Sequence, residues 1–203
     1  MKKGICYIAG AGECDRLLLY PQKEDMVIAV DGGYKLLKNQ RIDLIVGDFD
    51  SLKFVPEHDK VIQLPPEKDD TDMLFAIKEG LKAGYDIFYI YGGTGGRFAH
   101  TIANVQCLAY LEEHGAKGYL FGKEEVTTIL VNNSMTFDES YQGYISVFAY
   151  GEEAKGVTLE GLKYPLKDAV LSQRMPLGVS NEFTGKEAKI TVRDGALLVI
   201  YQT

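Results

Sequence analysis

Two aspartates separated by one residue follow an apolar run in the N-terminal half of the chain. The run Ile42–Val46 is rich in branched aliphatic residues, and Gly47 ends it just before Asp48 and Asp50. Such a run predicts a β-strand buried on both faces, with the two carboxylates at its carboxyl end. Open α/β sheets bind ligands at that edge. Asp48 and Asp50 could therefore hold one divalent cation, and the alternative is an ordinary surface turn.

A second acidic segment, residues 68–72 (KDDTD), opens a predicted helix. The helix is indicated by apolar residues at helical spacing before Gly84, namely Met73, Leu74, Ile77 and Leu81. Aspartate and threonine at a helix N-terminus can simply cap unpaired amides. Three aspartates and a lysine in five residues exceed what a cap requires, and clustered like charges disfavour folding unless a cation offsets them. The segment therefore favours a functional role.

A glycine-rich loop at residues 92–97 (GGTGGR) lies between a predicted strand and a predicted helix. Glycines leave backbone amides accessible and Arg97 adds a guanidinium, which together make a natural phosphate cradle. The loop lacks the Lys-Ser/Thr ending of a Walker loop. His100 and Asn104 lie one helical turn apart, so both could face the ligand of the loop.

The composition is that of a globular chain. Its 203 residues fit one large domain or two small ones, and 46% hydrophobic residues suffice for a substantial core. A formal net charge of −7 argues against a nucleic-acid partner. No stretch is long enough to span a bilayer. The three cysteines show no metal-ligand spacing and cannot all pair within one chain, so we expect a cytoplasmic protein with no membrane partner.

The N-terminal part alternates predicted strands and helices, which is typical of an α/β fold with a Rossmann-like, mostly parallel sheet flanked by helices. Strands are expected at residues 4–9, 26–30, 42–46, 61–64 and 86–91, and helices at 13–20, 34–39, after the acidic segment up to Gly84, and at 98–114. The face of the last helix expected against the sheet comprises Ile102, Val105, Gln106, Leu108, Ala109 and Leu111.

After Gly115 the helical periodicity gives way to short strand-like pieces separated by turn signals. They predict an all-β C-terminal domain, sandwich-like or barrel-like. We place the domains at residues 1–122 and 123–203, although the strand around Tyr119 could belong to the first sheet. The densest polar cluster of the second domain is GVSNE at residues 178–182, which on its own pattern is an ordinary turn.

Five motifs together resemble a known family. They are Asp31-Gly32-Gly33, Gly47-Asp48-Phe49-Asp50-Ser51, Lys68-Asp69-Asp70-Thr71-Asp72, Gly96-Arg97-Phe98-Ala99-His100 with Asn104, and Ser180-Asn181-Glu182. In this order, and over nearly the whole chain, they resemble the thiamin pyrophosphokinases. The resemblance implies a homodimeric enzyme that transfers diphosphate from ATP to the hydroxyethyl group of thiamine, giving thiamine diphosphate and AMP with Mg²⁺ as cofactor.

The resemblance also implies roles for individual residues. Asp48, Asp50 and Asp72 would form the magnesium shell, with Asp31 nearby as a further carboxylate, and the three together with Arg97 would be the catalytic group. Asp72 could also accept the proton of the attacking alcohol. The ATP-binding residues would be Asp31, Lys68, Asp69, Thr71, Gly95, Gly96, Arg97, His100 and Asn104. Thiamine would contact Asp72, and Ser180 and Asn181 where the β domain of one subunit faces the α/β domain of the other.

Two departures from the family pattern lie in the sequence. Ala99 stands where members commonly have an aspartate, which motivates the alternative of a catalytically degenerate protein that binds thiamine phosphates. The chain contains no tryptophan, so a tyrosine or phenylalanine such as Phe183 is expected to stack on thiamine.

Other classes share one of the motifs. Asp48-Phe49-Asp50 also fits the Asp-x-Asp pattern of metal-dependent nucleotide-sugar transferases and of some phosphatases. The acidic helix start and the glycine–arginine loop favour a nucleoside triphosphate over either class.

Overall fold

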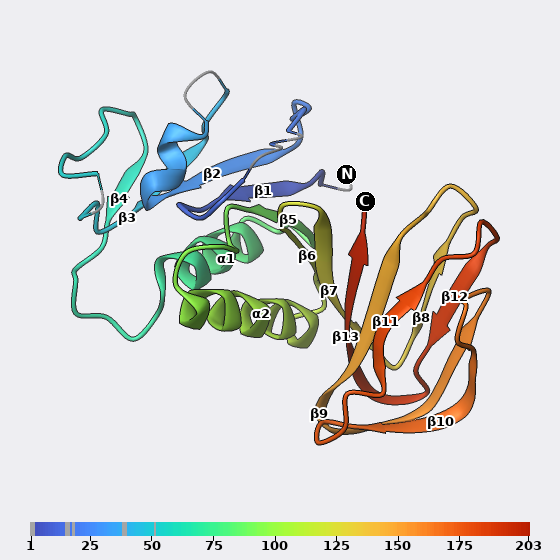
Figure 1. Ribbon diagram of the computed structural model, residues 1–203. Coiled ribbons are helices and arrows are strands. Elements are labelled where there is room, and N and C mark those ends of the chain that lie inside the picture. Colours follow the sequence, from blue (N-terminus) through green and yellow to red (C-terminus); the bar gives the residue numbers. More distant parts are fainter. Residues whose placement is uncertain (1–2, 15–16, 18, 38–39, 51) are drawn as a thin grey trace. The chain divides into compact units, whose positions relative to one another are not determined.

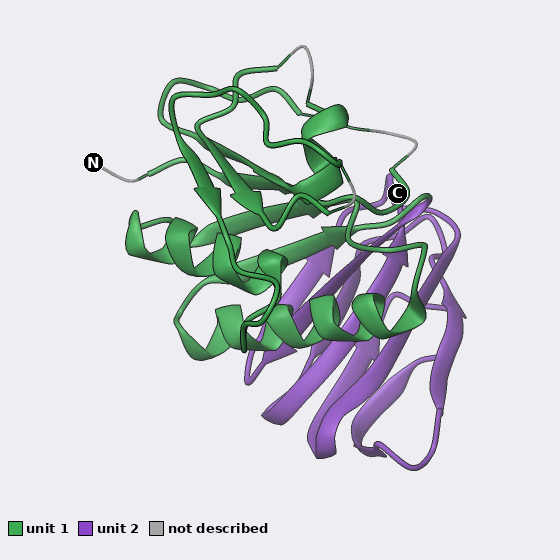
Figure 2. Cartoon of the chain, turned by 90° about the vertical axis from the view of Figure 1, so that its left-hand side faces the viewer, with its two compact units in different colours: residues 1–123 green, residues 124–203 purple. Residues whose placement is uncertain are grey.

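The computed structural model describes residues 3–14, 17, 19–37, 40–50 and 52–203. The chain forms two compact units, unit 1 at residues 1–123 and unit 2 at residues 124–203 (Figure 2). Unit 1 combines a sheet with helices, whereas unit 2 is rich in β-strands. Among the described residues, no helix is long and apolar enough to cross a membrane.

Unit 1 is built on parallel strands (Figure 1). Its strands are β1 (Cys6–Ala9), β2 (Met26–Val30), β3 (Leu44–Gly47), β4 (Val61–Gln63), β5 (Ile87–Tyr91) and β6 (Lys117–Phe121), and its helices are the 3₁₀ helix η1 (Asp31–Lys35), α1 (Asp72–Lys82) and α2 (Phe98–Glu113). Parallel pairing gives the order β4-β3-β2-β1-β5-β6. The chain therefore runs outward from β1 to β4 and then returns to the other side of β1.

The central strands are apolar and inaccessible to solvent, as the sequence of 42–46 predicts for β3. Ile8, Ile28 and Ile45 have no exposed surface. Helices α1 and α2 lie on one side of this sheet (Figure 1). Gly80 allows α1 to approach closely, because a Cβ there would lie 2.5 Å from a ring carbon of Phe88. The buried strands thus form a rigid layer whose carboxyl ends can hold functional groups.

Two expected helices differ from the structure. The described residues of the segment 13–20 are not helical, because backbone groups at its start pair with a neighbouring loop, as in the bond from Glu13 N–H to the carbonyl of Thr94 (3.0 Å). Residues 15, 16 and 18 of that segment lie outside the described residues. The helix expected at 34–39 is replaced by η1, which starts earlier, and residues 38 and 39 are likewise outside the described part.

The buried face of α2 also differs from the expected one. Its buried residues are Asn104, Cys107, Leu108 and Leu111, which recur at helical spacing and include a polar residue. Ile102 is 46% exposed, and Gln106 is exposed. Leu108 and Leu111 are buried as expected, whereas Asn104 and Cys107 were not expected on this face.

Unit 2 is organised around one long strand. Its strands are β7 (Glu125–Val131), β8 (Ser134–Phe137), β9 (Tyr144–Glu160), β10 (Leu166–Ser172), β11 (Gly178–Glu182), β12 (Ala188–Thr191) and β13 (Asp194–Gln202). The first part of β9 pairs antiparallel with β13 and β11, and its second part pairs with β10 and β12. Strand β7 extends the first set through β13, and β8 extends the second through β12.

Candidate active site

The strand order of unit 1 reverses between β1 and β5, which is where open α/β sheets bind ligands. The loops that follow these strands are joined by backbone hydrogen bonds, from Gly10 N–H to the Tyr91 carbonyl (2.8 Å) and from Gly12 N–H to the Gly92 carbonyl (2.7 Å). A Cβ on Gly12 would lie 2.3 Å from the carbonyl oxygen of Thr94. Glycine is therefore required for the two loops to meet, and a cavity of about 440 Å³ opens beside them.

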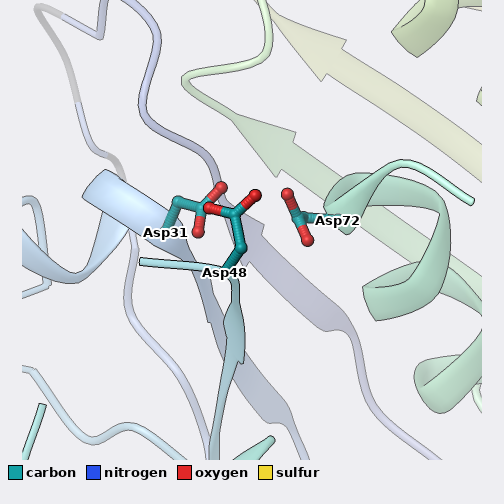
Figure 3. A group of neighbouring side chains, drawn as sticks. All are labelled: Asp31, Asp48 and Asp72. Carbon is teal, nitrogen blue, oxygen red and sulfur yellow. The ribbon is translucent and has the colours of Figure 1, made fainter. Parts of the chain in front are cut away.

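Three carboxylates converge at the wall of this cavity. Asp31 follows β2, Asp48 follows β3, and Asp72 begins α1. One oxygen from each lies within 4.8 Å of the others (Figure 3). Two oxygens on opposite sides of an octahedral magnesium ion would be about 4.2 Å apart. The three carboxylates are close enough together to be ligands of one magnesium ion, and their oxygens are the ligand type that it prefers.

The turn after β3 is shaped to receive Asp31. A Cβ on Gly47 would lie 1.9 Å from Asp31 Oδ1, so only glycine leaves room for that carboxylate. Phe49 has a φ of 62° and is 3% exposed. Its N–H donates to Asp31 Oδ1 (3.2 Å). A left-handed backbone is rare for an aromatic residue and costs about 1–3 kcal/mol, which burial of the Phe49 ring in the core offsets.

Asp50 does not join the three carboxylates. Its side chain is exposed, and its N–H donates to Asp48 Oδ1 (3.1 Å). The left-handed Phe49 between the two aspartates turns the chain, so the expected pair of Asp48 and Asp50 is replaced by a group in which Asp31 is the third carboxylate. Ser51, quoted in the same motif, lies outside the described residues.

Lys68 supplies a cation to this group. Its Nζ is 2.7 Å from Asp72 Oδ1 and 3.5 Å from Asp48 Oδ2. Burial alone would lower the pKa of Lys68, but Asp72 and Asp48 outweigh it and raise that pKa. Burial, together with the negative charges of Asp72 and Asp48, raises the pKa of Asp31 to about 6, against the opposing hydrogen bond from Phe49. The single positive charge of Lys68 therefore does not fully offset the negative charge of the three carboxylates.

The phosphate-cradle residues lie on the same cavity. Gly95, Gly96, Arg97, His100 and Asn104 all line it. Arg97 and His100 are exposed, and Nη2 of the guanidinium contacts Nε2 of the imidazole. Asn104 is 8% exposed and donates from Nδ2 to the Gly93 carbonyl (2.6 Å). Asn104 therefore stabilises the backbone conformation of the glycine-rich loop.

The residues of the acidic segment at the start of α1 have different roles. Thr71 caps α1, because its Oγ1 accepts the N–H of Leu74 (3.1 Å). Asp70 lines the cavity and pairs with Lys78 through both oxygens, at 2.7 and 2.8 Å. Asp69 is exposed and is not among the residues that line the cavity.

Two family models match the chain. One, "Thiamin pyrophosphokinase, catalytic domain", matches residues 17–120, and the other, "Thiamin pyrophosphokinase, vitamin B1 binding domain", matches residues 127–197. The chain belongs to the thiamin pyrophosphokinase family. The thiamine pyrophosphokinase of Bacillus subtilis (strain 168) is 28% identical over 194 residues, which cover 91% of this chain and 90% of that protein.

Solved structures of the thiamin pyrophosphokinase family share the fold. The crystal structure of the Bacillus subtilis enzyme has 26% identity and a TM-score of 0.85, covering 98% of this chain and 99% of the other. That of the Geobacillus thermodenitrificans protein has 27% identity and a TM-score of 0.83, covering 98% of each chain. The thiamin pyrophosphokinase from Candida albicans has 15% identity and a TM-score of 0.79, covering 98% of this chain and 90% of the other.

The region matched by the vitamin B1 binding model contains Ser180 and Asn181. Ser180 is exposed, has a φ of 56°, and donates its N–H to Ser146 Oγ (3.0 Å). Asn181 is 5% exposed. Its Oδ1 accepts the N–H of Tyr164 (2.9 Å), and its Nδ2 donates to the Tyr164 carbonyl (2.8 Å). The side chain of Asn181 is therefore committed to holding the backbone of Tyr164.

The structure excludes Phe183 as an exposed stacking ring. Phe183 is 9% exposed. Its ring lies 5.2 Å from that of Phe137 and 5.6 Å from that of Tyr141, centroid to centroid. Phe183 belongs to an aromatic core. By contrast, Tyr164 is 57% exposed and is fixed by Asn181, a contact between residues 17 positions apart that the sequence pattern did not signal.

Sequence reasoning gave too little weight to two further parts of the site. The loop at residues 10–12 lacks the third glycine of a dinucleotide fingerprint, yet it lines the cavity. Asp31, expected in the ATP site and near the magnesium shell, lies with Asp48 and Asp72 in the carboxylate group. In both cases the available signal was a polar or glycine residue immediately after a buried strand.

Proposed function

We propose that this protein is a thiamine diphosphokinase that transfers the diphosphate of magnesium-bound ATP to the hydroxyethyl group of thiamine and releases AMP. Membership of the thiamin pyrophosphokinase family supports this activity. The observation that carries it is the convergence of three carboxylates on a cavity that is also lined by a glycine-rich loop with an arginine. Metal ligands and phosphate-binding groups thus share one space.

In this proposal Asp31, Asp48 and Asp72 hold Mg²⁺, which when bound supplies neutralisation of charge on the phosphate oxygens. Asp50 contributes through its N–H, which orients Asp48. The thiamine oxygen attacks the β-phosphorus, the bond from that phosphorus to the α-phosphate oxygen breaks, and AMP leaves. Asp72 accepts the proton of the alcohol. No covalent intermediate on the protein is required.

The remaining groups position the nucleotide. Lys68 and Arg97 supply positive charge to the phosphates, and the amides of Gly95 and Gly96 at the start of α2 supply hydrogen bonds. His100 orients Arg97 through its contact with the guanidinium. Asn104 keeps the loop in place, Thr71 fixes the start of α1, and Asp69 is assigned to the outer edge of the ATP site.

Thiamine would be bound with the help of unit 2. We assign Tyr164 as the aromatic ring that stacks on the cationic thiamine, since cation–π attraction operates with tyrosine as well as tryptophan. Ser180, next to Asn181 in the sequence, offers an exposed polar group, and Asn181 acts by holding the backbone of Tyr164. We further propose a homodimer in which this segment of one subunit serves the site of the other.

The test is incubation of the purified protein with ATP, Mg²⁺ and thiamine, followed by chromatography. The proposal expects thiamine diphosphate and AMP in equal amounts. Formation of ADP, or release of AMP without thiamine diphosphate, would exclude it. Binding of thiamine diphosphate without turnover would favour the degenerate binding protein suggested by Ala99, which is exposed in the first turn of α2.

A further inference from the structure

The ammonium of Lys68 pairs with two of the three carboxylates that could hold a divalent cation. It lies between Asp72 and Asp48, at 2.7 and 3.5 Å, and the side chain is 15% exposed. Among the described residues, Lys68 is the cation that forms ion pairs with this carboxylate group. A magnesium ion would bind about 2.1 Å from carboxylate oxygens of this group, so it would compete with the ammonium for them.

We propose that Lys68 is a built-in counter-ion that a divalent cation displaces from Asp72 and Asp48, and that the displaced ammonium then pairs with the phosphate chain of the nucleotide. The cation and the nucleotide would consequently bind with positive cooperativity. This rests on the proposed function, which supplies the identity of both ligands.

The cooperativity follows from the negative groups with which the displaced ammonium of Lys68 can pair. Without a phosphate, displacement leaves a largely buried ammonium without its carboxylate partners, which opposes binding of the metal alone. With a phosphate in the cavity, whose lining includes both Lys68 and the glycine loop, the ammonium gains a new negative partner. By linkage, the factor by which nucleotide strengthens metal binding equals the factor by which metal strengthens nucleotide binding.

The test measures binding without turnover. Mn²⁺ replaces Mg²⁺ as a paramagnetic probe, and the nucleotide is α,β-methylene-ATP, in which the bond that the reaction would break is blocked. Calorimetry gives the affinity of the protein for the analogue without metal and with saturating Mn²⁺, and electron paramagnetic resonance gives the affinity for Mn²⁺ alone. In the natural protein we expect weak binding of Mn²⁺ alone and a coupling factor of roughly tenfold or more.

Lys68→Met removes the counter-ion. It should bind Mn²⁺ alone several-fold more tightly than the natural protein, and its coupling factor should be smaller, retaining only the direct attraction between metal and phosphate. Lys68→Arg keeps a cation and should retain weak binding and coupling. Lys78→Met is the matched control, because Lys78, on α1, also pairs with an aspartate of the cavity, Asp70. It should change the affinity for Mn²⁺ by less than about twofold.

Thermal unfolding of each variant establishes that it is folded before titration. Unchanged or weaker binding of Mn²⁺ to Lys68→Met, or a coupling factor equal to that of the natural protein, would overturn the counter-ion role while leaving the proposed activity standing. Absence of Mn²⁺ binding in every variant would overturn the metal site as well. Because thiamine is absent from the titrations, failure of the thiamine assay would not affect their outcome.

Discussion

At the scale of single residues, Asp48 and Asp50 share a motif but occupy different environments. Asp48 belongs to the carboxylate group, and Asp50 offers its backbone N–H to Asp48. We expect Asp48→Asn to lower kcat for thiamine diphosphate formation by at least about a hundredfold. Asp50→Asn keeps the N–H, so its loss should be below about tenfold. Both are measured by product chromatography at saturating ATP.

The fold should survive in both variants, because exposed or half-buried carboxylates at a strand end contribute little packing. Cooperative urea unfolding with an unchanged slope checks this. If Asp48→Asn unfolds without cooperativity, Asp48 is structural. If Asp50→Asn loses as much activity as Asp48→Asn, then its carboxylate enters the site when ligands bind.

Asp31 makes stability depend on pH when no metal is bound. Its pKa is raised from 3.8 to about 6 by burial and by Asp72 and Asp48, so the folded state favours the protonated acid. The stability from this group is fully present below pH 3.8 and is lost as pH rises through 6. Asp31→Asn lacks this dependence and can still accept the N–H of Phe49.

In the presence of a chelator, Asp31→Asn should therefore have a larger free energy of unfolding than the natural protein at pH 7, and the difference should vanish towards pH 4. Saturating Mg²⁺ should shrink the difference at pH 7, because the cation favours ionised carboxylates. Urea unfolding across this pH range measures it. A difference that does not change with pH would show that Asp31 does not titrate in this way.

At the scale of elements, the glycine loop after β5 depends on α2 beneath it. Asn104 is buried and donates to the Gly93 carbonyl, so Asn104→Ala leaves that carbonyl without this donor at a cost of about 1–3 kcal/mol in stability. A looser loop should raise KM for ATP several-fold and change kcat less. Steady-state kinetics with varied ATP measure both.

Gln106→Ala is the control for Asn104→Ala, since Gln106 is exposed on the same helix. It should change stability by less than about 0.5 kcal/mol and leave KM for ATP unchanged. Equal effects in the two variants would mean that helix propensity, and not the bond to Gly93, governs the loop.

Sequence patterns predicted most elements of unit 1, because these elements depend mainly on residues that are close together in the sequence. The apolar run at 42–46 became β3, and the acidic segment became the start of α1. The left-handed Phe49 could not be predicted, because its backbone is held by burial of the ring and by a bond to Asp31, 18 residues away. The helix expected at 13–20 failed for a related reason, since its first residue, Glu13, bonds to the loop after β5.

The order of the strands also determines which carboxylates meet in this group. Asp31 and Asp48 follow neighbouring strands β2 and β3, and parallel pairing brings the two carboxyl ends together. Residue types identified Asp72 and Lys68 as site residues, but only the fold shows that Lys68 pairs with Asp72 and Asp48. Likewise, only the fold shows that Asn181 bonds the backbone of Tyr164, an exposed tyrosine.

At the scale of the whole molecule, the proposed homodimer has a consequence for mixtures of defective subunits. Asp48→Asn damages the metal group in unit 1, and Tyr164→Ala removes the stacking ring in unit 2. If unit 2 of one subunit serves the site of the other, a heterodimer of these variants carries both lesions in one site and neither in the second. One normal site per heterodimer is thereby regenerated.

Random mixing of equal amounts makes half of the dimers mixed, so about a quarter of the natural activity should return. The subunits are exchanged by unfolding and refolding together, and activity is assayed at a thiamine concentration where Tyr164→Ala alone is nearly inactive. Each variant refolded by itself is the control and should stay low. If every site draws on one subunit only, each site keeps its own lesion, and the mixture will show just the average of the two controls.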